Sequence, residues 1–160
     1  MRKIAIELKW GIIFFAVILL WTVFEKSIGL HDEKIDKHYI LTNFFAIPAI
    51  IIYVLALLNK RKWLGGTMTW VQGFMAGLVI AFIVSLLSPV GQYLTHEYLS
   101  PDYFSNIIEY SVSQGEDRTA MENYFTLSNY IKMSMVGALM MGAITSAIVA
   151  IFTRKNAPES

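Results

Sequence analysis

The sequence contains no cysteine, and only 16% of its residues are charged. Without cysteine there is no disulfide framework, no thiolate nucleophile and no cysteine metal site. A soluble protein carries about 25% charged residues. The low charge, together with 56% hydrophobic residues, therefore favours a chain that contacts lipid. Its length of 160 residues fits a single domain over residues 1–160.

The familiar catalytic signatures are also missing. The sequence has no His-Glu-x-x-His, no Gly-x-Ser-x-Gly, no phosphate-binding glycine loop and no dinucleotide fingerprint. A proton- or ion-coupled transporter would ordinarily carry a charged group at mid-depth, and the apolar segments of this chain hold none. We therefore expect a chain that is not an enzyme and that carries no cofactor.

Four apolar segments occupy residues 10–24, 39–58, 68–87 and 133–152. Twenty residues at about 1.5 Å each cover the roughly 30 Å hydrocarbon core of a bilayer. The first segment is shorter, so either Lys9 and Lys26 extend toward the membrane surfaces, or the helix continues to Gly29 with the boundary charge Glu25 slightly inside. We favour the first, with Gly29 as the helix stop. The pattern predicts an all-α integral membrane four-helix bundle.

Prolines and capping signals predict where these helices bend and end. Pro48 predicts a kink in the second segment, because proline removes a helical hydrogen bond. Ser88-Pro89 is expected to close the third segment, with an alternative in which a helical pattern resumes over Gln92–Leu99, and this leaves an outer connector at residues 88–132. Two helix-start signals, at Ser100-Pro101 and in a capping box over residues 119–122, predict short amphipathic helices in that connector.

Small residues recur at every fourth position of the third and fourth segments. Residues four apart lie on nearly the same side of a helix, and small side chains there allow two membrane helices to approach closely. We interpret the two stripes as a packed helix pair; a dimer contact and a substrate path are the alternatives. The residues are Gly73, Gly77, Ala81 and Ser85, and then Ser134, Ala138, Gly142, Ser146 and Ala150.

Basic residues gather on one side of the predicted bundle. Because cytoplasmic loops are rich in lysine and arginine, this asymmetry predicts that both termini lie in the cytoplasm. Ten of the 12 acidic residues fall on the opposite side. The basic residues on the predicted inner side are Arg2, Lys3, Lys9, Lys60, Arg61, Lys62, Arg154 and Lys155.

All three histidines fall on the predicted outer side, beside several carboxylates. Imidazole and carboxylate together suit zinc or another divalent ion. The spacing matches no known site, however, and a connector outside a membrane is polar in any case, so a solvated connector is the competing interpretation. The candidate metal ligands are His31, Asp32, Asp36, His38 and His96.

Several separated motifs of this chain resemble one known family. They are Gly29–His38 running into Thr42–Pro48, Gln72-Gly-Phe74 ahead of Leu87-Ser-Pro89, and the closing Ile151–Lys155. Together they resemble the bacterial membrane family called domain of unknown function 4199, from about Lys3 to Lys155. The resemblance implies a small, multi-pass, four-helix protein of the inner membrane. It implies no activity, cofactor or catalytic residue.

Two roles from different classes remain open at this point. The first is a non-enzymatic scaffold or interaction protein, whose outer helices and acidic face meet another membrane protein or a second copy of the chain. The second is a small transporter or channel component that uses the kinked second helix. In both cases the lipid bilayer is an expected partner and nucleic acid is not. A polar cavity that reaches Asn43 and Gln72 would favour transport, and a dry core would favour the scaffold.

Overall fold

The computed structural model describes residues 4–156, so Arg2 and Lys3 of the predicted inner side lie outside the described residues. Within this range the chain is helical between its turns, and its sole β-type pairing is an isolated bridge from Met68 to Lys155. Four helical stretches are long and apolar enough to cross a membrane. The predicted all-α membrane bundle is therefore confirmed. The stretches are Ala5–Ser27, Ile35–Trp63, Trp70–Leu99 and Leu127–Thr153.

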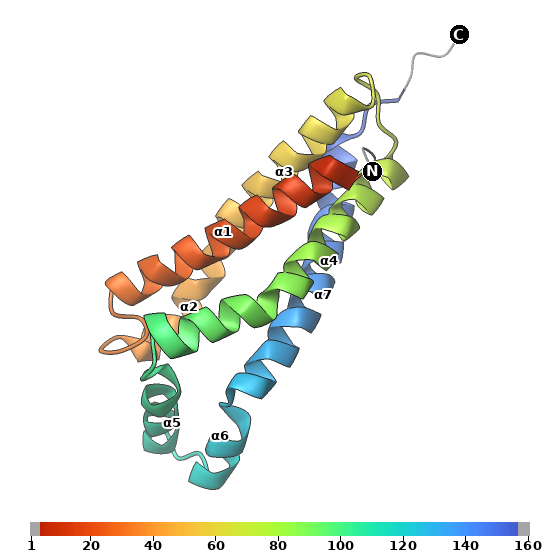
Figure 1. Ribbon diagram of the computed structural model, residues 1–160. Helices are drawn as coiled ribbons and strands as arrows, with labels where there is room; N and C mark the ends of the chain where they lie inside the picture. The colour runs from red at the N-terminus through yellow and green to blue at the C-terminus, as the bar shows by residue number, and fades with distance from the viewer. Residues whose placement is uncertain (1–3, 157–160) are drawn as a thin grey trace.

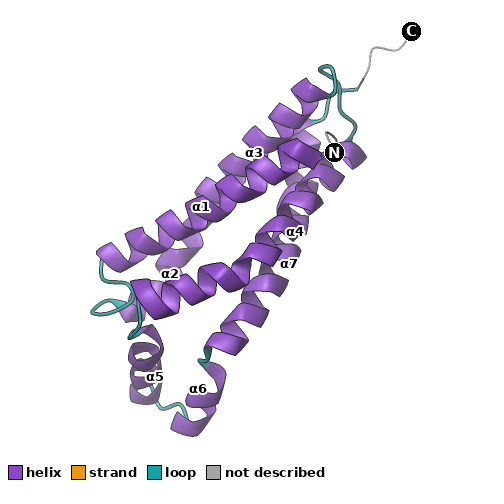
Figure 2. Cartoon of the chain, viewed as in Figure 1, coloured by secondary structure: helices purple, strands orange, loops and turns teal. Residues whose placement is uncertain are grey.

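Figure 1 shows that the described residues begin and end at the same end of the bundle, which we call the terminal end. The opposite end, which we call the distal end, holds the short helices α5 and α6. Loops connect the long helices only near these two ends (Figure 2). Four crossings of a membrane would give this arrangement, because an even number of crossings returns the chain to its starting side.

The first helix, α1, spans Ala5–Ser27 and is longer than its apolar segment. The residue that stops the helix is Gly29, which lies just beyond its last turn and has φ +84. The N–H of Gly29 donates to the carbonyl of Lys26 and the N–H of Leu30 to that of Glu25, both at 3.0 Å. This pair of bonds is the Schellman closure, which needs a left-handed residue and therefore favours glycine. The predicted stop is confirmed, and it turns the chain back beside Glu25.

The second crossing consists of successive helical pieces. A short 3₁₀ turn, η2 (Ile35–Lys37), leads into α2 (His38–Leu41), then η3 (Thr42–Phe45), which is also 3₁₀, and finally α3 (Ala46–Trp63). The 3₁₀ segment η3 lies just before Pro48, whose ring blocks the α-helical hydrogen bond to the preceding turn. The expected disturbance at this proline therefore takes the form of a change in helical winding.

The third crossing is longer than the sequence predicted. Helix α4 spans Trp70–Leu94 and passes through Pro89, and it continues as a π-helix, η4 (Thr95–Leu99). The prediction that Ser88-Pro89 closes this span is therefore wrong. The hydroxyl of Ser88 bonds the carbonyl of Val84 at 2.9 Å, next to the turn that the proline disturbs. The extension carries Gln92 and His96 into the distal end of the bundle.

The connector at the distal end is correspondingly shorter than predicted. Helix α5 spans Tyr103–Ser113, α6 spans Arg118–Tyr124, and α7 spans Leu127–Thr153. The expected short helices are present, but the capping box over residues 119–122 is wrong. Asp117 caps α6 instead, and its carboxylate accepts from the N–H of Ala120 at 2.8 Å.

The small residues of α4 and α7 face one another in antiparallel register. A Cβ added to Gly73 would lie 3.2 Å from Cβ of Ala150, and one added to Gly142 would overlap Ala81. The backbones of the two helices approach closely here because the side chains between them are small. Such close packing holds helices together in lipid. The remaining positions of the two stripes take three roles. Gly77 meets Ser146, the hydroxyl of Ser85 donates to the carbonyl of Met135 at 3.0 Å, and Ser134 and Ala138 line a cavity.

Candidate functional site

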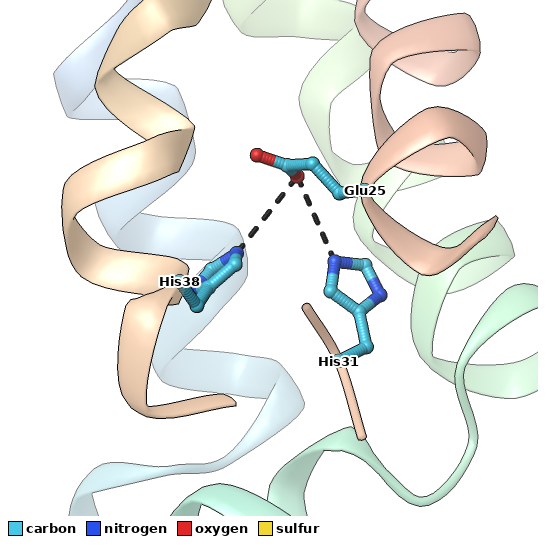
Figure 3. A group of neighbouring side chains, drawn as sticks. All are labelled: Glu25, His31 and His38. Carbon is cyan, nitrogen blue, oxygen red and sulfur yellow. Dashed lines mark ion pairs between the residues drawn. The ribbon is translucent and has the colours of Figure 1, made fainter. Parts of the chain in front are cut away.

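The distal end of the bundle brings Glu25, His31 and His38 together (Figure 3). Glu25 occupies the last turn of α1, His31 follows the Gly29 turn, and His38 begins α2. Oε2 of Glu25 lies 3.6 Å from Nε2 of His31 and 3.8 Å from Nε2 of His38. Glu25 and His31 are buried, and the His38 side chain is 20% exposed. One carboxylate oxygen thus faces both imidazoles.

Each of these three side chains is also held from its far side. Nε1 of Trp21 donates to Oε1 of Glu25 at 2.7 Å, which leaves Oε2 for the histidines. Nδ1 of His31 lies 2.6 Å from the hydroxyl of Ser100, and Nδ1 of His38 lies 3.3 Å from that of Tyr103. The orientation of both rings is therefore fixed by groups outside the cluster.

The turn that carries His31 is fastened to α1 and α5. The amide of Asn106 donates to the carbonyl of His31 at 3.0 Å and to Oδ1 of Asp32 at 3.3 Å. The ammonium of Lys26 pairs with Oδ2 of Asp32 at 2.7 Å. These bonds explain why a connector that the sequence allowed to be solvated is ordered and partly buried.

An aromatic group closes the cluster on the side of α4, α5 and α7. The ring of His96 stacks on Phe104, with centroids 4.0 Å apart, and Tyr103 and Tyr130 approach with their hydroxyl oxygens 3.5 Å apart. Burial raises the pKa of Tyr103 above its ordinary value. Its hydroxyl therefore stays protonated at neutral pH and can donate or accept a hydrogen bond.

His96 contributes a buried polar atom that is left over. The side chain is buried (7% exposed), and Nε2 lies 3.2 Å from Oε1 of Gln92. Nδ1 meets no hydrogen-bond partner among residues 4–156. A buried polar atom without a partner costs about 1–3 kcal/mol, so this nitrogen lowers the stability of the fold as the structure stands.

A cavity of about 680 Å³ extends from this cluster into the bundle. Its charged and imidazole groups lie at the distal end, and the remainder is mostly apolar, with Tyr53 and Thr145 among its polar exceptions. It reaches Asn43, but Gln72 is not among its lining residues, and Gln92 takes the place that the sequence reasoning gave to Gln72. The polar lining includes Glu25, His31, His38, Gln92, His96, Tyr103 and Tyr130, and the apolar lining includes Phe14, Ile18, Ile50, Val84, Met141 and Ile148.

The candidate ligands from the sequence are only partly brought together. His31 and His38 join one group, and His96 lines the same cavity outside that group. Asp32 is engaged by Lys26, and Asp36 is exposed. A solvated connector does not describe His31 and His96, because both are buried.

Sequence reasoning missed Glu25, since it treated this residue as a boundary charge. The available signal was its position in the sequence: Glu25 lies shortly before the helix stop at Gly29, and His31 lies shortly after it. A Schellman closure reverses the chain direction, so a residue in the last helical turn and one just after the glycine can come close together.

Comparison with known protein families matches residues 9–155 to a family described as Protein of unknown function (DUF4199). No curated protein and no solved structure matches the chain. The family match includes every residue of the cavity's polar end.

Proposed function

This chain belongs to the DUF4199 family, as its motifs suggested, and because the family description states no activity, we propose a function from the cavity. The protein binds an amphipathic membrane molecule, with an apolar chain in the middle of the bundle and a polar head among Glu25, His31, His38 and His96. Of the two roles that the sequence left open, this proposal develops the transporter class. The scaffold role would make no use of an interior cavity.

The shape and lining of the cavity support this proposal. Small-molecule sites are concave, mostly apolar and about 300–1,000 Å³ in volume, with a few polar groups that fix the orientation of the ligand. The cavity of about 680 Å³ has this composition, with its carboxylate and imidazole groups at one end. The gathering of a carboxylate and three imidazoles at one end of a largely apolar cavity is the single observation that carries the proposal, because these groups would bind a polar head.

The cavity also has a route to the lipid. Ile50 of α3 and Ile144 and Ile148 of α7 line it, and the same side chains are exposed on the surface of the bundle. The cavity therefore reaches the surface between these two helices. An amphipathic molecule could enter sideways from the bilayer without its apolar chain crossing water, which would cost about 0.8 kcal/mol per exposed CH₂ group.

We place this function in a multi-pass protein of the inner membrane, with both termini in the cytoplasm. The clustering of lysine and arginine at the terminal end supports that orientation. Large apolar side chains such as Leu20, Phe82 and Met140 are exposed along the long helices, which supports the lipid bilayer as the partner. Another membrane protein or a second copy of the chain remains a proposed further partner. Binding without covalent chemistry fits a chain that has no catalytic motif.

A pair of variants on α7 tests the proposal. A Cβ on Gly137 would meet no atom of residues 4–156 within 4 Å, and Gly137 lines the cavity, so Gly137→Phe adds a ring to open space. Met140→Phe is the matched control, because Met140 is exposed on the same helix and does not line the cavity. Both proteins are purified in mild detergent and extracted with organic solvent for mass spectrometry.

The wild type and Met140→Phe should retain one class of amphipathic molecule at close to one per chain. Gly137→Phe should lose it while keeping a wild-type circular dichroism spectrum. The proposal is wrong if the wild type retains no such class, or if Gly137→Phe retains as much as the control.

A further inference from the structure

The spacing inside the Glu25–His31–His38 cluster does not suit direct hydrogen bonds. Both Nε2 to Oε2 separations, at 3.6 and 3.8 Å, exceed the 2.7–3.2 Å range of N–H···O bonds. The bonds that hold the same side chains from outside are short, at 2.7 Å from Trp21 and 2.6 Å to Ser100. The cluster is therefore well fixed around a centre that its own atoms leave open.

A metal ion would fit that centre. Nitrogen and oxygen ligands at about 2.0–2.2 Å from a tetrahedral Zn²⁺ lie about 3.3 Å from one another. The three ligand atoms all lie within 4.8 Å of one another, and two of the separations are within a few tenths of an ångström of the tetrahedral value. We infer that Oε2 of Glu25, Nε2 of His31 and Nε2 of His38 form a divalent metal site of the zinc type.

The outer hydrogen bonds give both histidines the orientation of metal ligands. A ligating histidine usually donates its other ring N–H to a neighbouring acceptor, which fixes the tautomer. The hydroxyl of Ser100 is placed to accept in this way from Nδ1 of His31, and that of Tyr103 from Nδ1 of His38, when each ring carries its proton on Nδ1. With the protons on Nδ1, two imidazole lone pairs face a carboxylate oxygen. Three acceptors in one place repel one another unless a cation lies between them.

The composition of the cluster selects the class of metal. Two imidazoles and one carboxylate suit Zn²⁺ and similar borderline ions, whereas Mg²⁺ and Ca²⁺ prefer oxygen ligands alone. Three protein ligands leave one tetrahedral position for water or a ligand. All three ligands line the cavity, so this position is accessible from it. The inference does not depend on the proposed amphipathic molecule, because every ligand atom belongs to the chain.

Metal content tests the inference directly. Detergent-purified protein is stripped with a chelator, dialysed, and titrated with Zn²⁺ and separately with Co²⁺, whose visible absorption reports tetrahedral coordination. The wild type should take up one Zn²⁺ per chain and should give a tetrahedral Co²⁺ spectrum. An absence of stoichiometric binding by folded wild type would overturn the inference and leave ion pairs between Glu25 and protonated histidines as the explanation.

Variants locate the site. Glu25→Gln, His31→Ala and His38→Ala should abolish stoichiometric binding, with folding checked by circular dichroism. Asp36→Asn is the control for loss of a carboxylate, and His96→Gln is the control for loss of an imidazole outside the group. Both controls should bind like the wild type. Equal loss in the ligand variants and the controls would contradict the assignment.

Ser100 provides a second, graded test. Loss of an outer partner of a ligating histidine typically weakens metal binding about 10–100-fold. Ser100→Ala should show a loss in this range with the Co²⁺ spectrum still tetrahedral, and Ser100→Thr should restore the affinity because it keeps the hydroxyl. Unchanged affinity in Ser100→Ala would show that this hydroxyl does not orient a metal ligand.

Discussion

A Cβ on Gly77 would lie 2.6 Å from Cβ of Ser146, so α4 and α7 meet at this point without room for a side chain. The same antiparallel register places Gly73 near Ala150 and Gly142 near Ala81. Since lipid supplies no hydrophobic drive for helix association, this close backbone contact is a main source of stability for the pair.

Gly77→Leu should therefore destabilise the folded protein. Overpacking of a tight interface typically costs about 1–3 kcal/mol, and the buried side chains of Ser146 and Tyr53 would have to shift to make room. Thermal unfolding in detergent measures the effect. Val79→Leu is the control on the same helix, at a half-buried position, and should be near neutral. Equal stability of the two variants would remove the packing argument.

Lys60 and Glu7 form a buried ion pair at the terminal end. Nζ of Lys60 lies 2.6 Å from Oε1 of Glu7, and their side chains are 11% and 5% exposed. Removal of one member of a buried pair costs about 3–5 kcal/mol, because the other charge stays buried. Lys60→Ala should therefore lower the midpoint of thermal unfolding substantially.

Lys62→Ala is the matched control, because Lys62 is exposed and counts equally in the positive-inside rule. If the lysines of this loop served only to orient the chain, both variants would have the same midpoint of thermal unfolding. A large difference between them would assign Lys60 a structural role as well.

Arg118 holds Glu109 by two hydrogen bonds, at 2.8 and 3.0 Å, at the distal end. These bonds lower the pKa of Glu109 below its ordinary value of 4.5. The pairing therefore stabilises the fold above the ordinary pKa, and this contribution is lost as the pH falls through the lowered pKa. The effect on stability should be small, since both groups are exposed.

Arg118→Gln should return the pKa of Glu109 toward its ordinary value, as measured by NMR titration of the carboxyl group. Glu122→Gln is the comparison, because Glu122 lies 3.9 Å from Nη1 of Arg118, whereas Glu109 lies 2.8 Å from the same nitrogen. A pKa of Glu109 that is the same in wild type and Arg118→Gln would contradict the pairing.

The orientation in the membrane can be tested with reporter fusions. A reporter active only in the cytoplasm, fused after Ser160, should be active, and the same reporter inserted near Gly115 should be silent. The physical reason is the excess of lysine and arginine at the terminal end. An outward-facing C-terminus would overturn the proposed orientation.

The sequence by itself determined those features that depend on local chemistry. Four apolar segments, three of them 20 residues long, predicted four crossings, and Gly29 marked a helix end because its turn needs a left-handed residue. The period of four in the small residues pointed to the helices that could approach closely, and separated motifs indicated the family.

Only the tertiary structure decided the composition of the site. Glu25 becomes a partner of His31 and His38 because the Schellman turn folds the chain back on α1 and Asn106 of α5 fastens the turn. His96 reaches the cavity because α4 continues through Pro89 into a π-helix. Such contacts depend on the relative placement of elements distant in the chain, which no local pattern of residues specifies.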